Sequence, residues 1–314
     1  MKRASAPRTH AGDALHRGRI VATYGRHAML ETDAGVRLRC HPRGKRLDAV
    51  VGDLVDWSAA GDEGVIERVH ERRNLLFRQD AQRTKMLAAN IDQVLVLLAA
   101  EPVLSEAQLA RALIAARAAA VPALVALNKR DLQPAFERAW ARLAPYRDMG
   151  ETVLPLQLHN AGPEDATLAD LLSHLRKRVT LVMGPSGTGK STLINRLVPT
   201  AGVQTQAISQ ALGTGRHTTT RSTWYWLDAQ RRGALIDSPG FHEFGLHHIE
   251  PERLASLMPD LAPFVGRCRF HNCTHRQEPD CAIRAAIAPN GPIAPGRWQL
   301  YVSLFDELRA ARPY

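Results

Sequence analysis

The order of three short motifs along the chain constrains its fold more than any other feature. Asn128-Lys129-Arg130-Asp131 comes first, a glycine-rich stretch at residues 184–191 follows, and Asp237-Ser-Pro-Gly240 comes last. Each motif stands directly after an apolar run that predicts a buried strand, at residues 123–127, 179–183 and 234–236. In the usual fold that carries these motifs, the N-K-x-D segment ends the series. The sequence therefore predicts a circularly permuted fold, whose chain enters the sheet at a different strand.

The glycine-rich stretch has the spacing G-x4-G-K-S of a phosphate-binding loop, between a predicted strand and a predicted helix at 191–197. Glycines let the backbone wrap around phosphates, so that N–H groups and the helix N-terminus face the anion. We expect Lys190, a predicted catalytic residue, to reach the β- and γ-phosphates, and the hydroxyl of Ser191 to bind Mg²⁺. The predicted nucleotide-binding residues here are Gly184, Pro185, Ser186, Gly187, Thr188, Gly189, Lys190, Ser191 and Thr192.

The N-K-x-D segment predicts which base is bound. The carboxylate of Asp131 can accept hydrogen bonds from the ring N–H and the exocyclic amine of guanine, whereas adenine would leave a buried charge unpaired. Asn128 would brace the loop and contact the base, Lys129 would cover the ring, and Arg130 completes the predicted GTP-binding segment. The matching strand at 153–158 ends in Leu-Gln-Leu rather than the usual Ser-Ala. Since that contact uses backbone, the departure loosens the guanine assignment without overturning it.

The Asp-x-x-Gly segment is expected to sense hydrolysis. Asp237 can hold a Mg²⁺-bound water, and the N–H of Gly240 can contact the γ-phosphate. The stretch 213–220 carries hydroxyls suited to complete the Mg²⁺ shell. We predict Thr219 there, as both a magnesium ligand and a catalytic residue, with Thr218 and Thr220 as alternatives.

The residue after this segment predicts how hydrolysis is controlled. Phe241 stands where many signalling GTPases have a glutamine that orients the attacking water, and phenylalanine cannot do so. We therefore predict slow hydrolysis in the free protein. The rate would rise when a partner orders His217 or supplies a group in trans.

Three of the four cysteines lie in one short stretch, Cys268-x4-Cys273-x-His275-x5-Cys281. Three thiolates and one imidazole fill a tetrahedron and leave no open position, which predicts one structural zinc ion rather than a catalytic one. Buried free cysteines beside an incidental histidine remain an alternative, and His271 is a weaker candidate ligand. An iron–sulfur cluster would prefer four cysteines. The fourth, Cys40, lies far away in the sequence and is expected to pack as a small apolar residue.

The segments outside these motifs predict further strands and helices. Five short strand-like segments, at 19–24, 28–32, 36–40, 54–57 and 64–69, predict a small barrel of the OB type, which serves either as a nucleic-acid binder or as a spacer. From residue 92, apolar strands alternate with helices such as 105–120, as in a parallel sheet. Helices are expected at 251–264 and 296–311.

Charge and hydropathy limit the partners and the compartment. Residues 1–46 hold eleven basic and three acidic side chains, within a chain of net charge +10. This excess predicts contact with a polyanion, most simply RNA, although a solvated tail would also explain residues 1–16. No secretory h-region and no run of about 18 apolar residues occurs, so we expect a cytoplasmic protein that contacts no membrane. A monomer is the simplest expectation.

Across nearly its whole length, the chain resembles the ribosome small-subunit-dependent GTPase A family. The resemblance rests on the motifs above, on G-R-H-T-T-T at 215–220, on D-S-P-G-F-H-E-F-G-L at 237–246 and on the Cys/His set. It implies a late assembly factor that binds the small (30S) subunit through 16S rRNA and hydrolyses GTP to GDP in response. It also implies that His217 takes the place of the missing glutamine, against the alternatives that His217 contacts RNA or packs in a loop.

The expected architecture is α/β, with a circularly permuted P-loop GTPase domain at 86–248. A basic arm at 1–17 and an OB-type β-barrel at 18–85 precede this domain, and a helical zinc-binding domain at 249–314 follows it. Two other functions stay open. The phosphate loop also resembles that of guanylate kinases, which need neither N-K-x-D nor Asp-x-x-Gly. Alternatively, the chain is an RNA-binding module for which GTP is only a stabilising ligand.

Overall fold

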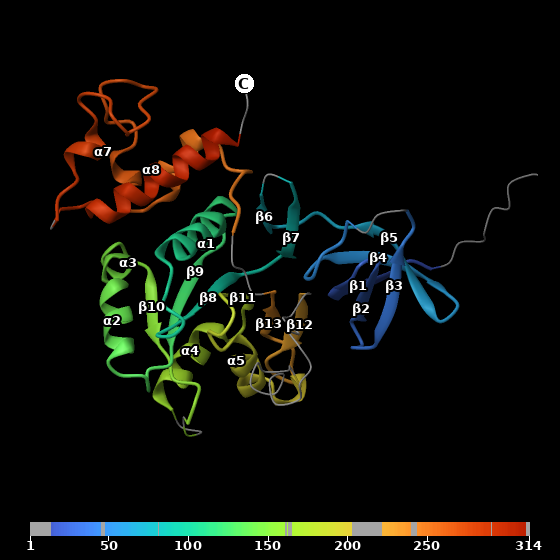
Figure 1. Cartoon of the computed structure of the whole chain (residues 1–314). Coiled ribbons are helices and arrows are strands. Elements are labelled where there is room, and N and C mark those ends of the chain that lie inside the picture. Colours follow the sequence, from blue (N-terminus) through green and yellow to red (C-terminus); the bar gives the residue numbers. More distant parts are fainter. Residues whose placement is uncertain are drawn as a thin grey trace, which may run out of the picture.

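The computed structural model describes residues 14–44, 48–80, 82–160, 162, 165–202, 222–239, 244–289 and 291–311. Along the chain, a small barrel is followed by a two-stranded hairpin, a sheet covered by helices and a C-terminal region rich in short helices (Figure 1). This order agrees with the one expected from the sequence.

The N-terminal part is a closed five-stranded barrel. Its strands are β1 (His16–Tyr24), β2 (His27–Thr32), β3 (Arg37–Pro42), β4 (Leu54–Ala60) and β5 (Glu63–Val69). They pair in the order β1-β2-β3-β5-β4, and β4 pairs back onto β1. Alternate residues point inward, and Ile20, Leu30, Cys40, Val55 and Ile66 form the barrel core. The OB-like barrel and the apolar environment of Cys40 are thereby confirmed.

In the part of the chain that the structure describes, the central sheet contains six strands: β8 (Gln93–Ala99), β9 (Ala123–Asn128), β10 (Thr152–Pro155), β11 (Val179–Met183), β12 (Thr223–Trp226) and β13 (Ala234–Asp237). Their spatial order is β10-β9-β8-β11-β13-β12, and only β12 runs antiparallel to its neighbour. Strand β9, which ends in the N-K-x-D segment, therefore lies two strands from β11, which ends in the phosphate loop. This is the permuted arrangement that the motif order predicted.

Helices cover both faces of this sheet. They are α1 (Glu106–Ala118), α2 (Ala135–Arg142), α3 (Ala144–Asp148), α4 (Ala166–Leu175) and α5 (Lys190–Leu197), followed by the short helix η1 (Pro199–Ala201). Strand β8 is buried along its whole length, with Val94, Val96 and Leu98 in the core beneath α1. Leu95 and Leu97 face the opposite core, which α4 and α5 close. A strand buried on both faces explains the continuous apolar run.

A hairpin that the sequence analysis did not predict joins the barrel to the sheet. It consists of β6 (Leu75–Gln79) and β7 (Thr84–Ala89), so the boundary expected between residues 85 and 86 lies within a strand. The backbone N–H of Gln79 donates to the carbonyl of Gly245, and the N–H of His247 donates back to the carbonyl of Gln79. The chain that follows the Asp-x-x-Gly segment is thereby bonded to the hairpin.

The C-terminal region consists of η2 (Pro251–Arg253), η3 (Ala255–Leu257), η4 (Ala262–Phe264), α7 (Ala282–Ala285) and α8 (Pro295–Ala310). The expected closing helix is present as α8. The continuous helix expected at 251–264 was wrong, because the segment forms three short 3₁₀ turns. Pro259 and Pro263 lack the N–H that an α-helix needs at those positions.

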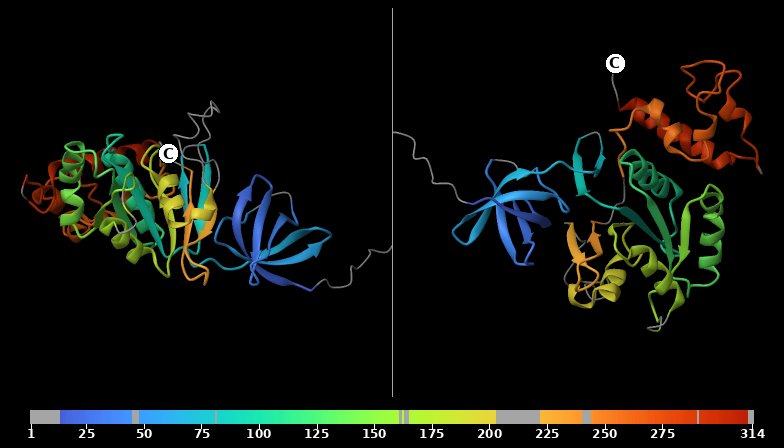
Figure 2. Two further views of the ribbon diagram at one scale, coloured as in Figure 1. Left: turned by 90° about the horizontal axis from the view of Figure 1, so that it is seen from below. Right: turned by 180° about the vertical axis from the view of Figure 1, so that it is seen from behind.

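The C-terminal region packs on the α1 side of the sheet, where its apolar side chains share one core with α1 (Figure 2). A buried ion pair lies at this junction. The guanidinium of Arg297 donates to both carboxylate oxygens of Asp260, at 2.8 and 3.0 Å, and also to the hydroxyl of Tyr146 on α3, at 3.3 Å. The side chains of Arg297 and Asp260 are 6% and 5% exposed, so water cannot take the place of either partner.

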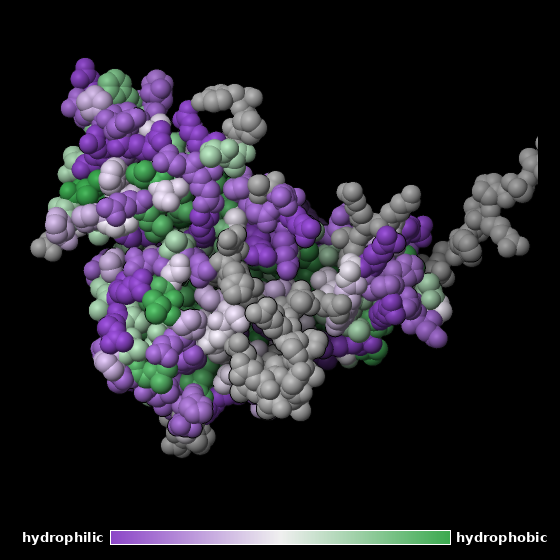
Figure 3. Space-filling view, viewed as in Figure 1, coloured by the Kyte–Doolittle hydropathy of each residue, from purple (hydrophilic) through white to green (hydrophobic). Residues whose placement is uncertain are grey.

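The barrel contacts the edge of the sheet at β12. Ala22 of β1 pairs with Thr223, and the indole N–H of Trp226 donates to the buried carboxylate of Glu31 at 2.7 Å. On the face in Figure 3, hydrophilic residues dominate the surface over the barrel. Within the described ranges, every helix is too short or too polar to cross a bilayer.

Candidate functional site

The glycine-rich stretch forms the turn between β11 and α5. Gly184 and Gly189 have φ angles of 157° and 101°, in the region that side chains disfavour. A Cβ at Gly184 would lie 2.2 Å from the carbonyl oxygen of Leu97, and one at Gly189 would lie 2.5 Å from Nδ2 of Asn128. Close approach of two other segments therefore requires glycine at both ends of the loop. The N-terminus of α5 opens directly onto this loop, with Ser191 and Thr192 half-buried in its first turn.

Lys190 folds over the loop. Its Nζ donates to the carbonyl oxygens of Gly184 and Pro185, at 2.8 and 2.7 Å. Burial lowers the pKa of Lys190 to about 8, although the nearby carboxylate of Asp237 acts in the opposite direction. The ammonium group is thus poorly solvated, and its hydrogen-bond partners among the described residues are neutral carbonyls. An anion placed in the loop would supply the missing counter-charge.

The base segment and the phosphate loop are joined by one side chain. Asn128, 3% exposed at the end of β9, donates from Nδ2 to the carbonyl of Thr188 at 2.9 Å. Its Oδ1 accepts from the backbone N–H of Leu158 at 3.1 Å. The expectation that Asn128 braces the loop agrees with this geometry. The same side chain also fixes the segment after β10.

The other members of the base segment are set by a left-handed turn. Lys129 has a φ of 66° and is half-buried, whereas Arg130 and Asp131 are exposed. The backbone N–H of Arg130 donates to the carbonyl of Leu156 at 3.2 Å, which ties the turn to the neighbouring segment. The carboxylate of Asp131 is therefore presented at the carboxyl end of the sheet, where folds of this type bind their ligands.

Asp237 lies on the other side of the phosphate loop. It ends β13, is 2% exposed, and pairs in register with Val182 of β11, close to the loop. The neighbouring hydroxyl of Ser238 donates to the carbonyl of Val182 at 2.8 Å. This arrangement brings Asp237 close enough to Lys190 for its negative charge to act on the pKa of the ammonium group. His217, Thr218, Thr219, Thr220, Gly240 and Phe241 lie outside the described residues.

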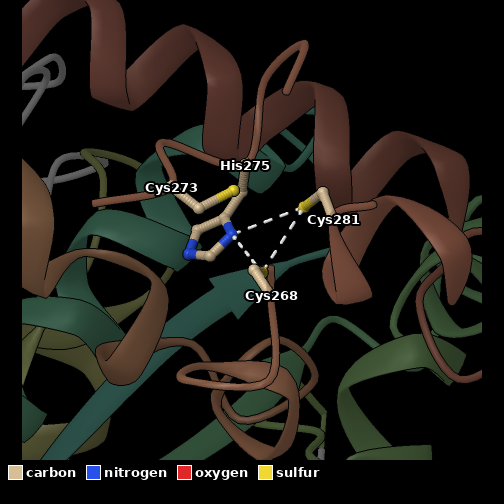
Figure 4. Close-up of side chains that lie close together, drawn as sticks. All are labelled: Cys268, Cys273, His275 and Cys281. Atoms are coloured by element: carbon tan, nitrogen blue, oxygen red, sulfur yellow. Dashed lines mark hydrogen bonds between the residues drawn. The ribbon is translucent and has the colours of Figure 1, made fainter. Parts of the chain in front are cut away.

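The Cys/His set forms a compact cluster. The candidate ligand atoms of Cys268, Cys273, His275 and Cys281 all lie within 4.8 Å of one another (Figure 4). Sγ of Cys268 is 3.8 Å from Sγ of Cys281, and Nδ1 of His275 is 3.4 and 3.5 Å from these two sulfurs. Bond lengths to zinc predict edges of about 3.8 Å between sulfurs and about 3.5 Å between sulfur and nitrogen. The spacing therefore fits a tetrahedral zinc ion, whereas the exposed His271 is not part of the cluster.

Neighbouring groups hold this cluster in place, and the sequence alone did not identify them. The indole N–H of Trp298 donates to the carbonyl of His275 at 3.0 Å, and the hydroxyl of Tyr301 donates to the carbonyl of Thr274 at 2.9 Å. Burial opposes ionisation of Glu278, but the Thr274 hydroxyl and backbone N–H groups bond its carboxylate and lower its pKa to about 2. Side chains of helix α8 thus support the loop by bonding to its backbone carbonyls. Because any residue has such a carbonyl, these contacts do not require a recognisable sequence pattern in the loop.

The sequence is similar to known proteins over nearly its whole length. The model of the RsgA GTPase family matches residues 69–247. "Small ribosomal subunit biogenesis GTPase RsgA" of Variovorax paradoxus is 56% identical over 301 residues, which cover 95% of this chain and 94% of the relative. The protein of the same name from Ralstonia pickettii is 46% identical, with all of both chains covered.

Two solved structures share the fold. YjeQ from Thermotoga maritima aligns with a TM-score of 0.73 at 27% identity, over 95% of this chain and all of that chain. YloQ, described as a circularly permuted GTPase, aligns with a TM-score of 0.68 at 25% identity, over 98% of this chain and all of that chain. The shared fold extends over the barrel, the permuted sheet and the C-terminal region.

Proposed function

The chain belongs to the RsgA GTPase family, and we propose that it hydrolyses GTP to GDP and phosphate during biogenesis of the small ribosomal subunit. The observation that carries the proposal is the hydrogen bond from Asn128 to the carbonyl of Thr188. This bond joins a guanine-reading segment to a phosphate-binding loop, so that one ligand can span both. The names of the relatives support the link to the small subunit.

In this proposal, the protein acts by positioning and by charge. Backbone N–H groups of residues 184 and 186–189 and the ammonium of Lys190 would bind the phosphates, and Asp131 would accept from guanine. Ser191, Asp237 and Thr219 would hold Mg²⁺, which supplies neutralising charge between the phosphates. Gly240 would contact the γ-phosphate. The two other functions left open by the sequence lack a role for this complete set of groups.

Hydrolysis is proposed to depend on the partner. Phe241 cannot orient water, and the family resemblance assigns that task to His217. Binding to the subunit is proposed to complete the site with His217, so the free protein would hydrolyse GTP slowly.

RNA contact is proposed for the barrel, but its positive surface is smaller than the sequence suggests. Arg39 pairs with Glu63 at 3.4 Å and Arg43 with Glu67 at 2.5 Å, so acidic side chains of the later strand β5 neutralise part of the excess. Arg17 and Arg26 are exposed and form no ion pair within the described residues. Arg26 and the arm at 1–17, which includes Arg17, are proposed to contact 16S rRNA.

The metal cluster is proposed to hold one structural zinc ion, bound by Cys268, Cys273, His275 and Cys281. Its region is connected to the nucleotide site through Phe244. Arg111 of α1 donates to the carbonyl of Phe244 at 3.4 Å and to the carboxylate of Glu307 on α8 at 2.8 Å. Movement of residues 237–246 after loss of the γ-phosphate would then shift the C-terminal region relative to the barrel and change how both bind RNA.

We also propose that the protein is a monomer in the cytoplasm.

Phosphate release from GTP tests this function. The purified protein is assayed alone, with small ribosomal subunits and with large subunits as the control. Strong stimulation by small subunits alone is expected. Equal, slow release in all three samples would favour an RNA-binding module that uses GTP only as a ligand, and formation of GDP from GMP and ATP would favour a nucleotide kinase.

A further inference from the structure

Hydrogen bonds fix the backbone of the segment after β10, while the side chains of Leu156 and Leu158 pack in the core. The N–H of Leu156 donates to Leu127 at 2.8 Å, and its carbonyl accepts from Arg130 at 3.2 Å. The N–H of Gln157 donates to the hydroxyl of Thr167 at 3.2 Å. These contacts matter because this segment has Leu-Gln-Leu where Ser-Ala is usual. Other groups must therefore fix the backbone that faces the guanine carbonyl.

Leu158 is held from both sides. Its N–H donates to Oδ1 of Asn128 at 3.1 Å, and its carbonyl accepts from Nη1 of Arg196 at 2.8 Å. Leu158 is 3% exposed, whereas the next residue, His159, is exposed. The buried residue Leu158 thus anchors the chain directly before the exposed His159.

The bond from Arg196 sets the orientation of the next N–H. The carbonyl of Leu158 and the N–H of His159 belong to one planar trans peptide unit, in which the two groups point in opposite directions. Fixing the carbonyl toward α5 therefore turns the N–H of His159 away from that helix. The side chain of Gln157 adds a second brace, since its Nε2 donates to the carbonyl of His159 at 3.3 Å.

Arg196 also connects the two ends of the nucleotide site. It lies in the last turn of α5, whose first residue is Lys190 of the phosphate loop. Its guanidinium is permanently charged and half-buried, so its bond to a carbonyl is stronger than a neutral one. The first residue of α5 thus belongs to the phosphate loop, and a residue in its last turn bonds to the segment that faces the base.

We propose that Arg196 is a positioning residue for guanine recognition, which orients the Leu158–His159 peptide so that the N–H of His159 donates to the guanine carbonyl. This inference rests on the proposed function, because it assumes that guanine occupies the space beside Asp131. Arg196 itself does not touch the nucleotide. The backbone N–H of His159 then makes the contact that the Ser-Ala backbone makes in other proteins with N-K-x-D, and Arg196 fixes its direction.

The test uses two ligands that differ at the guanine carbonyl and at the ring N–H beside it, so the effect of Arg196 is read by comparing each variant with wild type for the same ligand. GDP and 2-aminopurine riboside diphosphate, which lacks that carbonyl, are titrated into the full-length protein by calorimetry. Arg196→Ala should weaken GDP binding about tenfold and leave binding of the analogue within twofold of wild type. Arg196→Lys, which can still donate to Leu158, should recover most of the loss. Arg138→Ala, an exposed arginine on α2, is the matched control and should change neither affinity.

Two outcomes would overturn the inference. If Arg196→Ala weakened the binding of both ligands equally, Arg196 would only stabilise α5. If GDP affinity were unchanged, the Leu158–His159 peptide would not need Arg196 for its orientation. Failure of the proposed function is separate, because it is seen in the wild type. If the unmodified protein binds ADP as tightly as GDP, guanine is not its ligand.

Discussion

Nδ2 of Asn128 lies 2.9 Å from the carbonyl oxygen of Thr188, across a sequence separation of 60 residues. This contact brings the end of β9 against the phosphate loop after β11, although β8 lies between the two strands in the sheet. It explains why the permuted chain order does not disturb the site. The positions of the strand ends in space, not their order along the chain, determine which groups meet.

Replacing Asn128 tests this relationship. Asn128→Ala removes the donor to Thr188 and the acceptor of the Leu158 N–H, and both partner groups lie in buried surroundings. We expect GDP affinity to fall by 10- to 100-fold and the free energy of unfolding to fall by about 1 to 3 kcal/mol. Calorimetry and urea denaturation measure the two effects. Gln133→Ala, which removes an exposed side chain of the following turn, is the control. Wild-type affinity in Asn128→Ala would contradict the proposed bridge.

The lowered pKa of Lys190 predicts proton uptake on nucleotide binding. Its pKa of about 8 in the free protein means that the amine loses its proton as the pH rises through 8, and bound phosphates should raise that pKa again. At pH 9, GDP binding should therefore take up close to one proton, whereas at pH 6.5 uptake by this group should be near zero. Calorimetry in buffers of different ionisation enthalpy measures the uptake, which Lys190→Ala should abolish. Equal uptake at both pH values would refute the assignment.

The lowered pKa of Lys190 also predicts how the free energy of unfolding changes with pH. The unfolded chain keeps a lysine pKa near 10.5, so between pH 8 and 10.5 the unfolded state binds more protons than the folded state. The contribution of Lys190 to the free energy of unfolding is thus unfavourable below pH 8 and diminishes as the pH rises to 10.5. Lys190→Met should remove this pH dependence, as measured by urea denaturation at several pH values. An unchanged profile would show that other groups cause it.

Removal of a metal ligand tests the zinc site. Cys273→Ser should abolish binding of one zinc ion per chain and loosen the C-terminal region, because metal binding and folding are coupled. Elemental analysis measures the metal, and tryptophan fluorescence should report the loss through Trp298, which bonds to the backbone of His275. Cys40→Ala is the control, because Cys40 is buried in the barrel core, where burial raises its thiol pKa to about 11. Full zinc content in Cys273→Ser would exclude that residue as a ligand.

The buried ion pair predicts a large and specific loss of stability. Arg297→Ala leaves the carboxylate of Asp260 buried without its partner, which should lower the free energy of unfolding by about 3 to 5 kcal/mol. Arg269→Ala removes an exposed pair with Asp280 and should cost less than about 1 kcal/mol. Denaturant titration compares the two. A double variant, Arg297→Met with Asp260→Leu, should recover much of the loss, since no buried charge remains unpaired.

The sequence predicted those parts of the protein whose physical basis is local. The five barrel strands, the phosphate loop and the Cys/His spacing each depend on neighbouring residues, and the structure contains all of them. The expected helix at 251–264 was wrong because proline effects outweighed its apolar pattern. The hairpin formed by β6 and β7 was missed because its stability depends on contacts with residues 245–247, far away in the sequence.

Only the tertiary structure decided how these parts act on one another. The charge excess in residues 1–46 is partly neutralised by Glu63 and Glu67 from a later strand, which no local count can show. Arg196 and Trp298 were not singled out, because each bonds to a backbone carbonyl that any residue could provide. Motifs with fixed spacing are set by local chemistry and can be read along the chain. Partners that meet through the backbone of distant segments exist only once the chain has folded.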